Sequence, residues 1–277
     1  MRLIIPEHLK GKELFKFLVE NKPLLIRQKK MMLKHTDAVV CTPSIITPTK
    51  EGGTKSDADV NDPLAADTIN VKVVANTAWW CDHGMDVLTD GSYKKSVKEK
   101  GIMIPHIADH IWKSDSHVGD VNAVYTQEIS LKELGVKKQP GTTTALIFET
   151  AIRKLYNERV FLFYKLGKIK QHSIGLRYIS IGLCINDKDY LPEFELWNKY
   201  YEKVINKEMI DEHGYFWIVP EIEIIENSCV LFGMNELTPT LETSTEDKSL
   251  LKTEEPPGPT TTHQKSKETI DFGSIVL

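Results

Sequence analysis

The sequence lacks long apolar runs. None of its 277 residues belongs to a stretch near the roughly 18–20 apolar residues that a membrane-spanning helix requires. The opening residues, Met1 to Pro6, break off before an apolar core forms, so no signal peptide is expected. Charge of one sign is also scarce, because the formal net charge is −4 at pH 7. This charge provides no general attraction to nucleic acid or an anionic membrane, and we expect neither as a partner.

Cysteine is scarce as well, and the sequence has no Cys-x-x-Cys pair. The four cysteines are widely spaced: Cys41, Cys81, Cys184 and Cys229. This spacing argues against a disulfide framework or a zinc knuckle and fits a reducing cytosol. What is present is ordinary for a soluble globular protein, with 41% hydrophobic and 27% charged residues.

Composition along the chain predicts four parts. Residues 1–40 are expected to form a helical extension, and residues 41–68, rich in Thr, Pro, Gly, Ser and Asp, a linker. An independent domain is predicted over 69–239. Residues 240–277 have little apolar content and are predicted to be a flexible tail.

Within the extension, residues 7–36 are expected to form two helices, with Pro23 suited to the first turn of the second. The second helix is basic. It carries Arg27, Lys29, Lys30 and Lys34. Such a face is either solvated or a docking surface for an acidic partner.

Hydrophobic periodicity within 69–239 predicts a mainly β fold with flanking helices (α+β). Strands are expected from Ile69, over 144–152, 168–186 and 216–232. Helices are expected over 157–166 and 193–208, the second as an insertion.

Ser173 is the nucleophile candidate. It lies near the start of the strand predicted over 168–186, and Gly175 follows two residues later. With so little bulk beside the serine, another chain could approach closely.

The strand predicted over 216–232 contains an acid among apolar residues. Strict alternation places Glu226 on the same face as Ile222 and Ile224, which predicts that its carboxylate is buried. A buried carboxylate must be paired or hydrogen-bonded, either as a structural group held by backbone amides or as a catalytic acid.

A serine nucleophile needs a base, and a histidine suits neutral pH. His172 adjoins Ser173, but neighbours on a strand project to opposite faces, so it is poorly placed. His110, which can come from a separate strand, is the better candidate. A rival interpretation is a zinc site, since His106 and His110 have the i, i+4 spacing of helical ligands. Asp109, His83 and Asp82 could complete such a site.

Four segments together resemble motifs of a known family. Asp82–Val87 with Asp90–Tyr93 is similar to Asp-x-x-Gly-Asp followed by Pro-Gly-Ala-Phe. Ile104–Val121 is similar to an apolar strand that ends in a histidine, a short loop and Ile-Gly. Gly167–Leu176 is similar to Gly, a spacer and Ser-Ile-Gly-Phe, and Glu226–Asn235 to Glu-Val-Ser-Leu-Val with a trailing Ala-Asn. In this order they resemble the prohead (procapsid maturation) serine proteases of tailed bacteriophages, which share a fold with herpesvirus assemblins.

The resemblance covers about 69–239 and implies an assemblin-like barrel core. It places the catalytic histidine on His110, the nucleophile on Ser173 and the orienting acid on Glu226. An oxyanion hole is also required, and a backbone amide or Arg177 could supply it. The sequence departs from the family at Asn227, where an apolar residue is usual, in the 193–208 insertion and in a longer loop after His110.

The activity implied is that of a serine endopeptidase of phage head maturation. It would cleave capsid and scaffold proteins, and its own chain, inside the procapsid in the host bacterial cytoplasm. The implied partners are the major capsid protein, scaffold segments and further copies of this chain, with no cofactor or metal. An alternative is a non-catalytic capsid assembly or scaffolding factor on the same fold.

Overall fold

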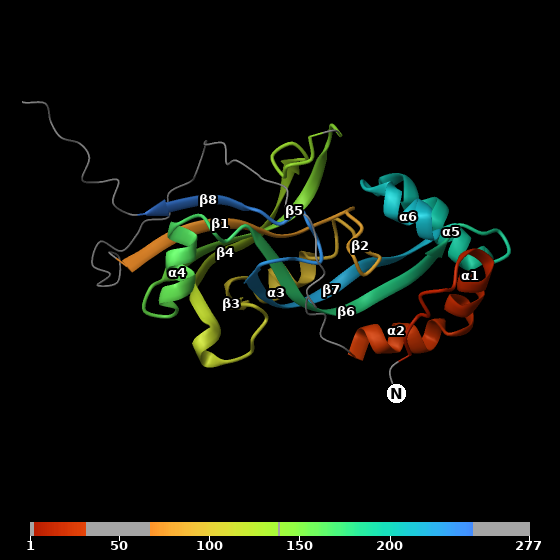
Figure 1. Ribbon diagram of the computed structural model, residues 1–277, viewed down its shortest axis with the longest axis horizontal. Helices are drawn as coiled ribbons and strands as arrows, with labels where there is room; N and C mark the ends of the chain where they lie inside the picture. Colours follow the sequence, from red (N-terminus) through yellow and green to blue (C-terminus); the bar gives the residue numbers. More distant parts are fainter. Residues whose placement is uncertain (1–2, 32–66, 138, 246–277) are drawn as a thin grey trace, which may run out of the picture. The chain divides into compact units, whose positions relative to one another are not determined.

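One large open β-sheet organises the computed structural model, which describes residues 3–31, 67–137 and 139–245 (Figure 1). The strand order is β2-β7-β3-β4-β5-β1-β8, and β6 pairs with β7. The strands are β1 (Thr68–Thr77), β2 (Asp86–Leu88), β3 (His106–Ala108), β4 (His117–Ser130), β5 (Thr142–Arg153), β6 (Gln171–Ile185), β7 (Tyr215–Val230) and β8 (Thr240–Thr245).

The sheet is open, so the expectation of a closed barrel is wrong. A barrel requires a continuous ladder of paired strands around the axis. Here β6 pairs along its length with β7, while β8 pairs with β1. An isolated bridge between Gln171 and Pro239 links the two ends of the sheet without forming a ladder. The fold is therefore mixed α/β around an open sheet.

The helices are short. They are α1 (Gly11–Glu20), α2 (Lys22–Met31), α3 (Lys94–Glu99), α4 (Glu158–Lys165), α5 (Leu191–Tyr200) and α6 (Lys207–His213), with single 3₁₀ turns at Gly101–Met103, Ser114–Ser116 and Tyr201–Lys203. Among the described residues, none of them has the length and apolar character to cross a membrane. Helix α4 confirms the helix expected over 157–166, and it is capped by Asn157, whose Oδ1 accepts a hydrogen bond from the Val160 amide at 3.1 Å.

Two hydrophobic cores lie along the β6–β7 pair. The first lies between one half of this pair and β1, β5 and α4, and includes Ile174, Leu176 and Ile224. The second contains the other half, with Trp217 and Leu183, and is covered by α1, α2, α5 and α6 (Figure 1). The 171–175 end of β6 therefore lies at the opposite end of the strand from the part that α1, α2, α5 and α6 cover.

The N-terminal extension packs against the domain. Leu14, Leu18 and Leu25 belong to the second core. Lys29 Nζ lies 2.7 Å from Oδ1 of the fully buried Asp86, and Lys22 Nζ lies 2.5 Å from Oε1 of Glu193. These lysines therefore pair with acids of the same unit, Met1–Glu246.

Two predicted boundaries are corrected. The helix expected over 193–208 is interrupted between Val204 and Asn206. The backbone is not helical there, and the Asn206 side chain forms hydrogen bonds with the Cys81 backbone. Its Oδ1 accepts from the Cys81 amide at 2.7 Å, and its Nδ2 donates to the Cys81 carbonyl at 2.9 Å. The first six residues of the predicted tail, Thr240–Thr245, form β8. The rest of the tail, most of the predicted linker and Cys41 lie outside the described residues.

Strand β7 carries a bulge that strict alternation misses. Gly175 of β6 is opposite Glu226, but the next residue, Leu176, is opposite Ile224. Ile225 is therefore the extra residue, and the faces exchange at this point. Glu226 is buried as predicted, at 1% exposure, but it lies on the face opposite to Ile224.

Candidate functional site

A strained turn presents His110. Strand β3 runs parallel to β7, and the chain then turns through Asp109 and His110, whose φ angles are +54° and +55°. Consecutive non-glycine residues in the left-handed region each cost roughly 1–2 kcal/mol. Such strain persists where surrounding contacts hold the backbone, and it concentrates at functional sites.

His110 pairs with Glu226. The imidazole Nδ1 lies 2.5 Å from Glu226 Oε1. The two side chains are only 5% and 1% exposed, so the contact is shielded from water. A carboxylate can only accept, so Nδ1 carries the hydrogen that it donates. This tautomer directs the basic Nε2 away from Glu226.

Gly175 makes room for this carboxylate. A β-carbon added at Gly175 would overlap Glu226 Oε1 and lie 3.0 Å from Cδ. The space beside Ser173 that was expected to admit another chain is therefore filled by the Glu226 side chain of the protein itself.

Ser228 bonds two parts of the pair. Its Oγ donates to Glu226 Oε2 at 2.7 Å and accepts from the His110 backbone amide at 3.1 Å. Ser228 is fully buried. No sequence pattern singled it out, although it stands within the Glu226–Asn235 segment that resembles the family.

Ser173 reaches the same face through strand register. It is paired with Ser228 across β6 and β7, one pair along from Gly175 and Glu226. Residues directly opposite on antiparallel strands have β-carbons about 5 Å apart on one face. Ser173 is 7% exposed. Register and burial thus bring the predicted nucleophile to the strand face that carries the His110–Glu226 pair.

The other central histidines occupy the opposite face of these strands. Tyr164 Oη lies 2.8 Å from His172 Nε2 and 3.3 Å from His106 Nε2, and both histidines are fully buried. Burial lowers the pKa of His172 to about 4. Burial and then the neighbouring His172 lower the pKa of His106 well below its usual range. The prediction that His172 is poorly placed as a base for Ser173 is confirmed, since the two project to opposite faces.

The zinc interpretation loses its geometric basis. His106 is in a strand and His110 is in the turn beyond it, so their i, i+4 spacing does not align them as on a helix. His106 Nδ1 lies 3.0 Å from Thr150 Oγ1, while His110 faces Glu226. Among the described residues, no group of three or more His, Cys, Asp or Glu side chains has an arrangement that could hold a metal ion.

Arg177 does not fit the role of oxyanion donor. It lies four residues beyond Ser173 on β6, a separation of about 13 Å along a strand. Its guanidinium is half exposed and pairs with Glu223, with Nη1 3.3 Å from Oε2.

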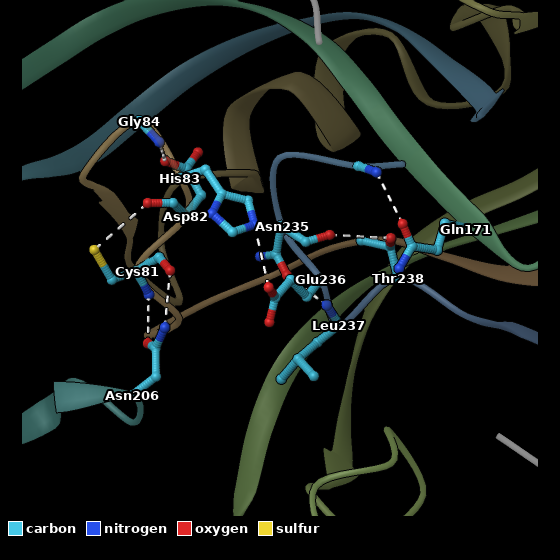
Figure 2. Close-up of polar contacts among 11 residues, drawn as sticks. Cys81, Asp82, His83, Gly84, Gln171, Asn206, Asn235, Glu236, Leu237 and Thr238 are labelled. Carbon is cyan, nitrogen blue, oxygen red and sulfur yellow. Dashed lines mark hydrogen bonds and ion pairs between the residues drawn. The ribbon is translucent and has the colours of Figure 1, made fainter. Parts of the chain in front are cut away.

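The first of the four resembling segments contacts the last one and the residue that follows it. The His83 amide donates to the Met234 carbonyl at 3.3 Å. Figure 2 shows the His83 ring directed at Glu236, with Nε2 3.1 Å from Oε1. Asp82 Oδ1 accepts from the Gly84 and Asp86 amides at 2.8 and 3.0 Å, which closes the turn before β2.

The loop after β7 is bonded to the start of β6. The Gly233 amide donates to Gln171 Oε1 at 2.9 Å (Figure 2). The His172 amide donates to the Thr238 carbonyl at 3.1 Å. A β-carbon at Gly233 would lie 2.7 Å from the His172 carbonyl oxygen, so a glycine permits this approach. The start of β6, which carries Ser173, is thus bonded to the loop after β7 as well as to β7 itself.

Asn227 is unusual for a buried residue. It is fully buried between Glu226 and Ser228, on the face opposite to theirs. Neither Oδ1 nor Nδ2 of its side chain has a hydrogen-bond partner within the described part of the chain. Unsatisfied buried amides are rare in folded proteins.

Comparisons with known proteins add nothing to this geometry. A scan against protein-family models, a search of curated proteins and a search of solved structures each find no match.

Proposed function

We propose that this protein is a serine endopeptidase in which Ser173 is the nucleophile, His110 the base and Glu226 the orienting acid. The observation that carries the proposal is the 2.5 Å contact between His110 Nδ1 and the shielded Glu226 Oε1. A histidine held by a buried acid through Nδ1 is the arrangement that activates serine in unrelated protease folds. The opposition of Ser173 to Ser228 supports the choice of nucleophile.

The chemistry follows from these roles. Nε2 of His110 removes the proton from Ser173 Oγ as the oxygen bonds to the substrate carbonyl carbon. The carbon–nitrogen bond then breaks, and His110 gives the proton to the departing amine. Water then attacks the acyl carbon while His110 takes its proton, and His110 returns the proton to Ser173 Oγ as the ester bond breaks. Glu226 holds the imidazole in the productive tautomer and stabilises its cationic form.

The substrates we propose are capsid and scaffold proteins during phage head assembly, which is what the resemblance of the four segments implies. The chain itself is a further candidate substrate. The non-catalytic alternative, an assembly or scaffolding factor on the same fold, uses none of this chemistry.

Labelling with a fluorophosphonate reagent tests the activated serine without knowledge of the substrate. We expect one adduct on the wild-type protein, located at Ser173 by peptide mass mapping. Ser173→Ala should abolish it. Ser180→Ala is the matched control, because Ser180 is an exposed serine on the same strand.

The substrate class is tested by co-expression with a candidate capsid protein and its scaffold. Wild type should shorten one or both chains, whereas Ser173→Ala should leave them at full length. Full-length chains in both cases, together with no labelling of wild type, would reject the protease and favour the non-catalytic alternative.

A further inference from the structure

We propose that Ser228 is the positioning residue of this site: its single hydroxyl fixes the His110 backbone and the Glu226 carboxylate at the same time. The catalytic consequence rests on the proposed protease function, whereas the positioning itself does not. The observations that carry it are the two hydrogen bonds of Ser228 Oγ and its complete burial.

Hydrogen-bond directions leave one arrangement. Glu226 Oε1 is occupied by His110 Nδ1, so Oε2 is the carboxylate oxygen that accepts from Ser228. The hydroxyl has one hydrogen, and an ionised carboxylate can only accept, so the hydrogen points to Glu226. The His110 amide can only donate, so it uses a lone pair of the same oxygen. The oxygen thereby joins the acid to the backbone of the histidine.

The turn at His110 needs such support. Asp109 donates from its amide to the Cys229 carbonyl at 3.1 Å, and Ile111 donates to the Ala108 carbonyl at 3.0 Å. Between them, the amide of His110 itself is bonded to Ser228. Because Asp109 and His110 both have φ near +55°, loss of this bond should let the turn relax and move the imidazole. A displacement of about 1 Å in a catalytic group can lower a rate by a factor on the order of 100.

Register adds the third member of the site. Ser228 is directly opposite Ser173. The residue that bonds Glu226 and His110 is therefore also the one whose register on β7 fixes where Ser173 lies along β6. All three members of the site are therefore positioned relative to one residue of β7.

The test uses the full chain and two readouts. The first is the low-field NMR resonance of the His110 Nδ1 proton, assigned by its loss in Glu226→Gln. The second is the rate of fluorophosphonate labelling at Ser173, in which the oxygen–phosphorus bond forms, fluoride leaves and the proton passes to His110. Ser228→Ala should shift or broaden the resonance and slow labelling by about tenfold or more. Ser228→Thr retains the hydroxyl and should restore both.

The matched control is Ser96→Ala. Ser96 is also a buried serine bonded to β7, with Oγ donating to the Ile222 carbonyl at 3.0 Å and accepting from the Ile224 amide at 2.9 Å. It should leave both readouts unchanged. Equal effects of the two alanine variants would mean that only general stability was lost, and would overturn the inference. So would an unchanged resonance and rate in Ser228→Ala, or a folded threonine variant that restores neither.

Two further outcomes distinguish the positioning role of Ser228 from the folding of the variant and from the protease function. If Ser228→Ala does not fold, amide hydrogen exchange of wild type decides, since a His110 amide that exchanges without protection would overturn the proposed bond. If wild type is not labelled but its low-field resonance moves in Ser228→Ala, the positioning role stands and the protease function fails.

Discussion

At the scale of single residues, strand face decides chemistry. His172 and Ser173 are adjacent in sequence, yet one contacts Tyr164 in the buried cluster and the other is opposite Ser228. His106 and His110 also have different surroundings. His106 lies in β3 and contacts Thr150 and Tyr164, whereas His110 lies in the turn after β3 and contacts Glu226. Two residues without polar side chains, Gly175 and Ile225, set where the Glu226 carboxylate lies.

We expect Gly175→Ala to destabilise the protein by about 1–3 kcal/mol, because the added methyl overlaps a buried carboxylate that is bonded through both oxygens. Urea unfolding measures the change. Gly182→Ala is the control on the same strand. There, the added carbon meets only side-chain carbons, Leu196 Cδ1 at 3.1 Å and Ile218 Cγ2 at 3.2 Å. Equal losses in the two variants would contradict the role assigned to Glu226.

Stability should fall as pH is lowered through the weakly acidic range. In the folded protein burial holds the pKa of His172 at about 4, whereas an unfolded histidine titrates near 6.5. Between these values the unfolded chain binds more protons, so acid favours unfolding. The stability is fully present above pH ~6.5, and His172 alone should remove about 3 kcal/mol by pH ~4.

The measurement is the free energy of unfolding in urea between pH 8 and 4.5. His172→Gln should flatten the slope in that window. His117→Gln, at an exposed histidine of β4, should keep the wild-type slope. An unchanged slope in the His172 variant would show that another group governs the acid response.

At the scale of elements, the two ends of the β6–β7 pair differ in what they contact. One end is covered by α1, α2, α5 and α6, and the other carries the candidate site (Figure 1). The bulge at Ile225 lies between them and exchanges the faces of β7, which frees Glu226 from the apolar core.

Helix α2 should be held by its buried ion pair. Lys29→Met removes the ammonium that lies against Asp86, and Asp86 is fully buried. Removing one partner of a buried pair costs about 3–5 kcal/mol, measurable by urea unfolding. Lys29 Nζ also lies over the Trp217 ring at 5.4 Å, so a cation–π interaction is lost too.

Lys30→Met provides the matched control. Its Nζ donates to the Ile179 carbonyl at 2.7 Å at an exposed position, and the change should cost less than about 1 kcal/mol. Adding Asp86→Asn to Lys29→Met should recover part of the loss, because the buried negative charge is then removed as well. No recovery would mean that the ion pair is not what holds α2.

At the scale of the whole molecule, the described chain forms one unit that includes both the N-terminal helices and β8. Strand β8 covers the edge of β1, and Thr240 Oγ1 donates to the Ile169 carbonyl at 3.0 Å beside the start of β6. The sheet therefore extends beyond the predicted domain limit at residue 239.

Truncation tests how much β8 contributes to this unit. A chain that ends after Glu246 should unfold at nearly the wild-type temperature, since it keeps β8. A chain that ends after Pro239 exposes β1 as an edge and should lower Tm by about 5 °C or more and promote association. Calorimetry and light scattering measure both effects. Equal Tm values for the two truncations would show that β8 contributes nothing to the fold.

Local pattern is sufficient to predict several elements of the fold. The strands β1, β5, β6 and β7 and the helix α4 follow from apolar periodicity and turn residues near one another in the chain. Local pattern does not predict strand β4, because it is largely half-buried or exposed and has polar residues such as Asn122, Gln127 and Glu128. Long strands of that kind have little apolar signal.

Strand alternation is enough to predict that Glu226 is buried, although the bulge places it on the face opposite to the predicted one. That His110 meets Glu226 follows only from the resemblance of the four segments and not from periodicity. Nothing in the sequence predicts that Ser228 bonds both, that the faces exchange at Ile225 or that the sheet stays open. These features arise only in the folded chain, because each depends on register between segments up to 118 residues apart, as for His110 and Ser228. One extra residue in a strand reverses the direction of every side chain beyond it, and only the paired strands reveal where that residue lies.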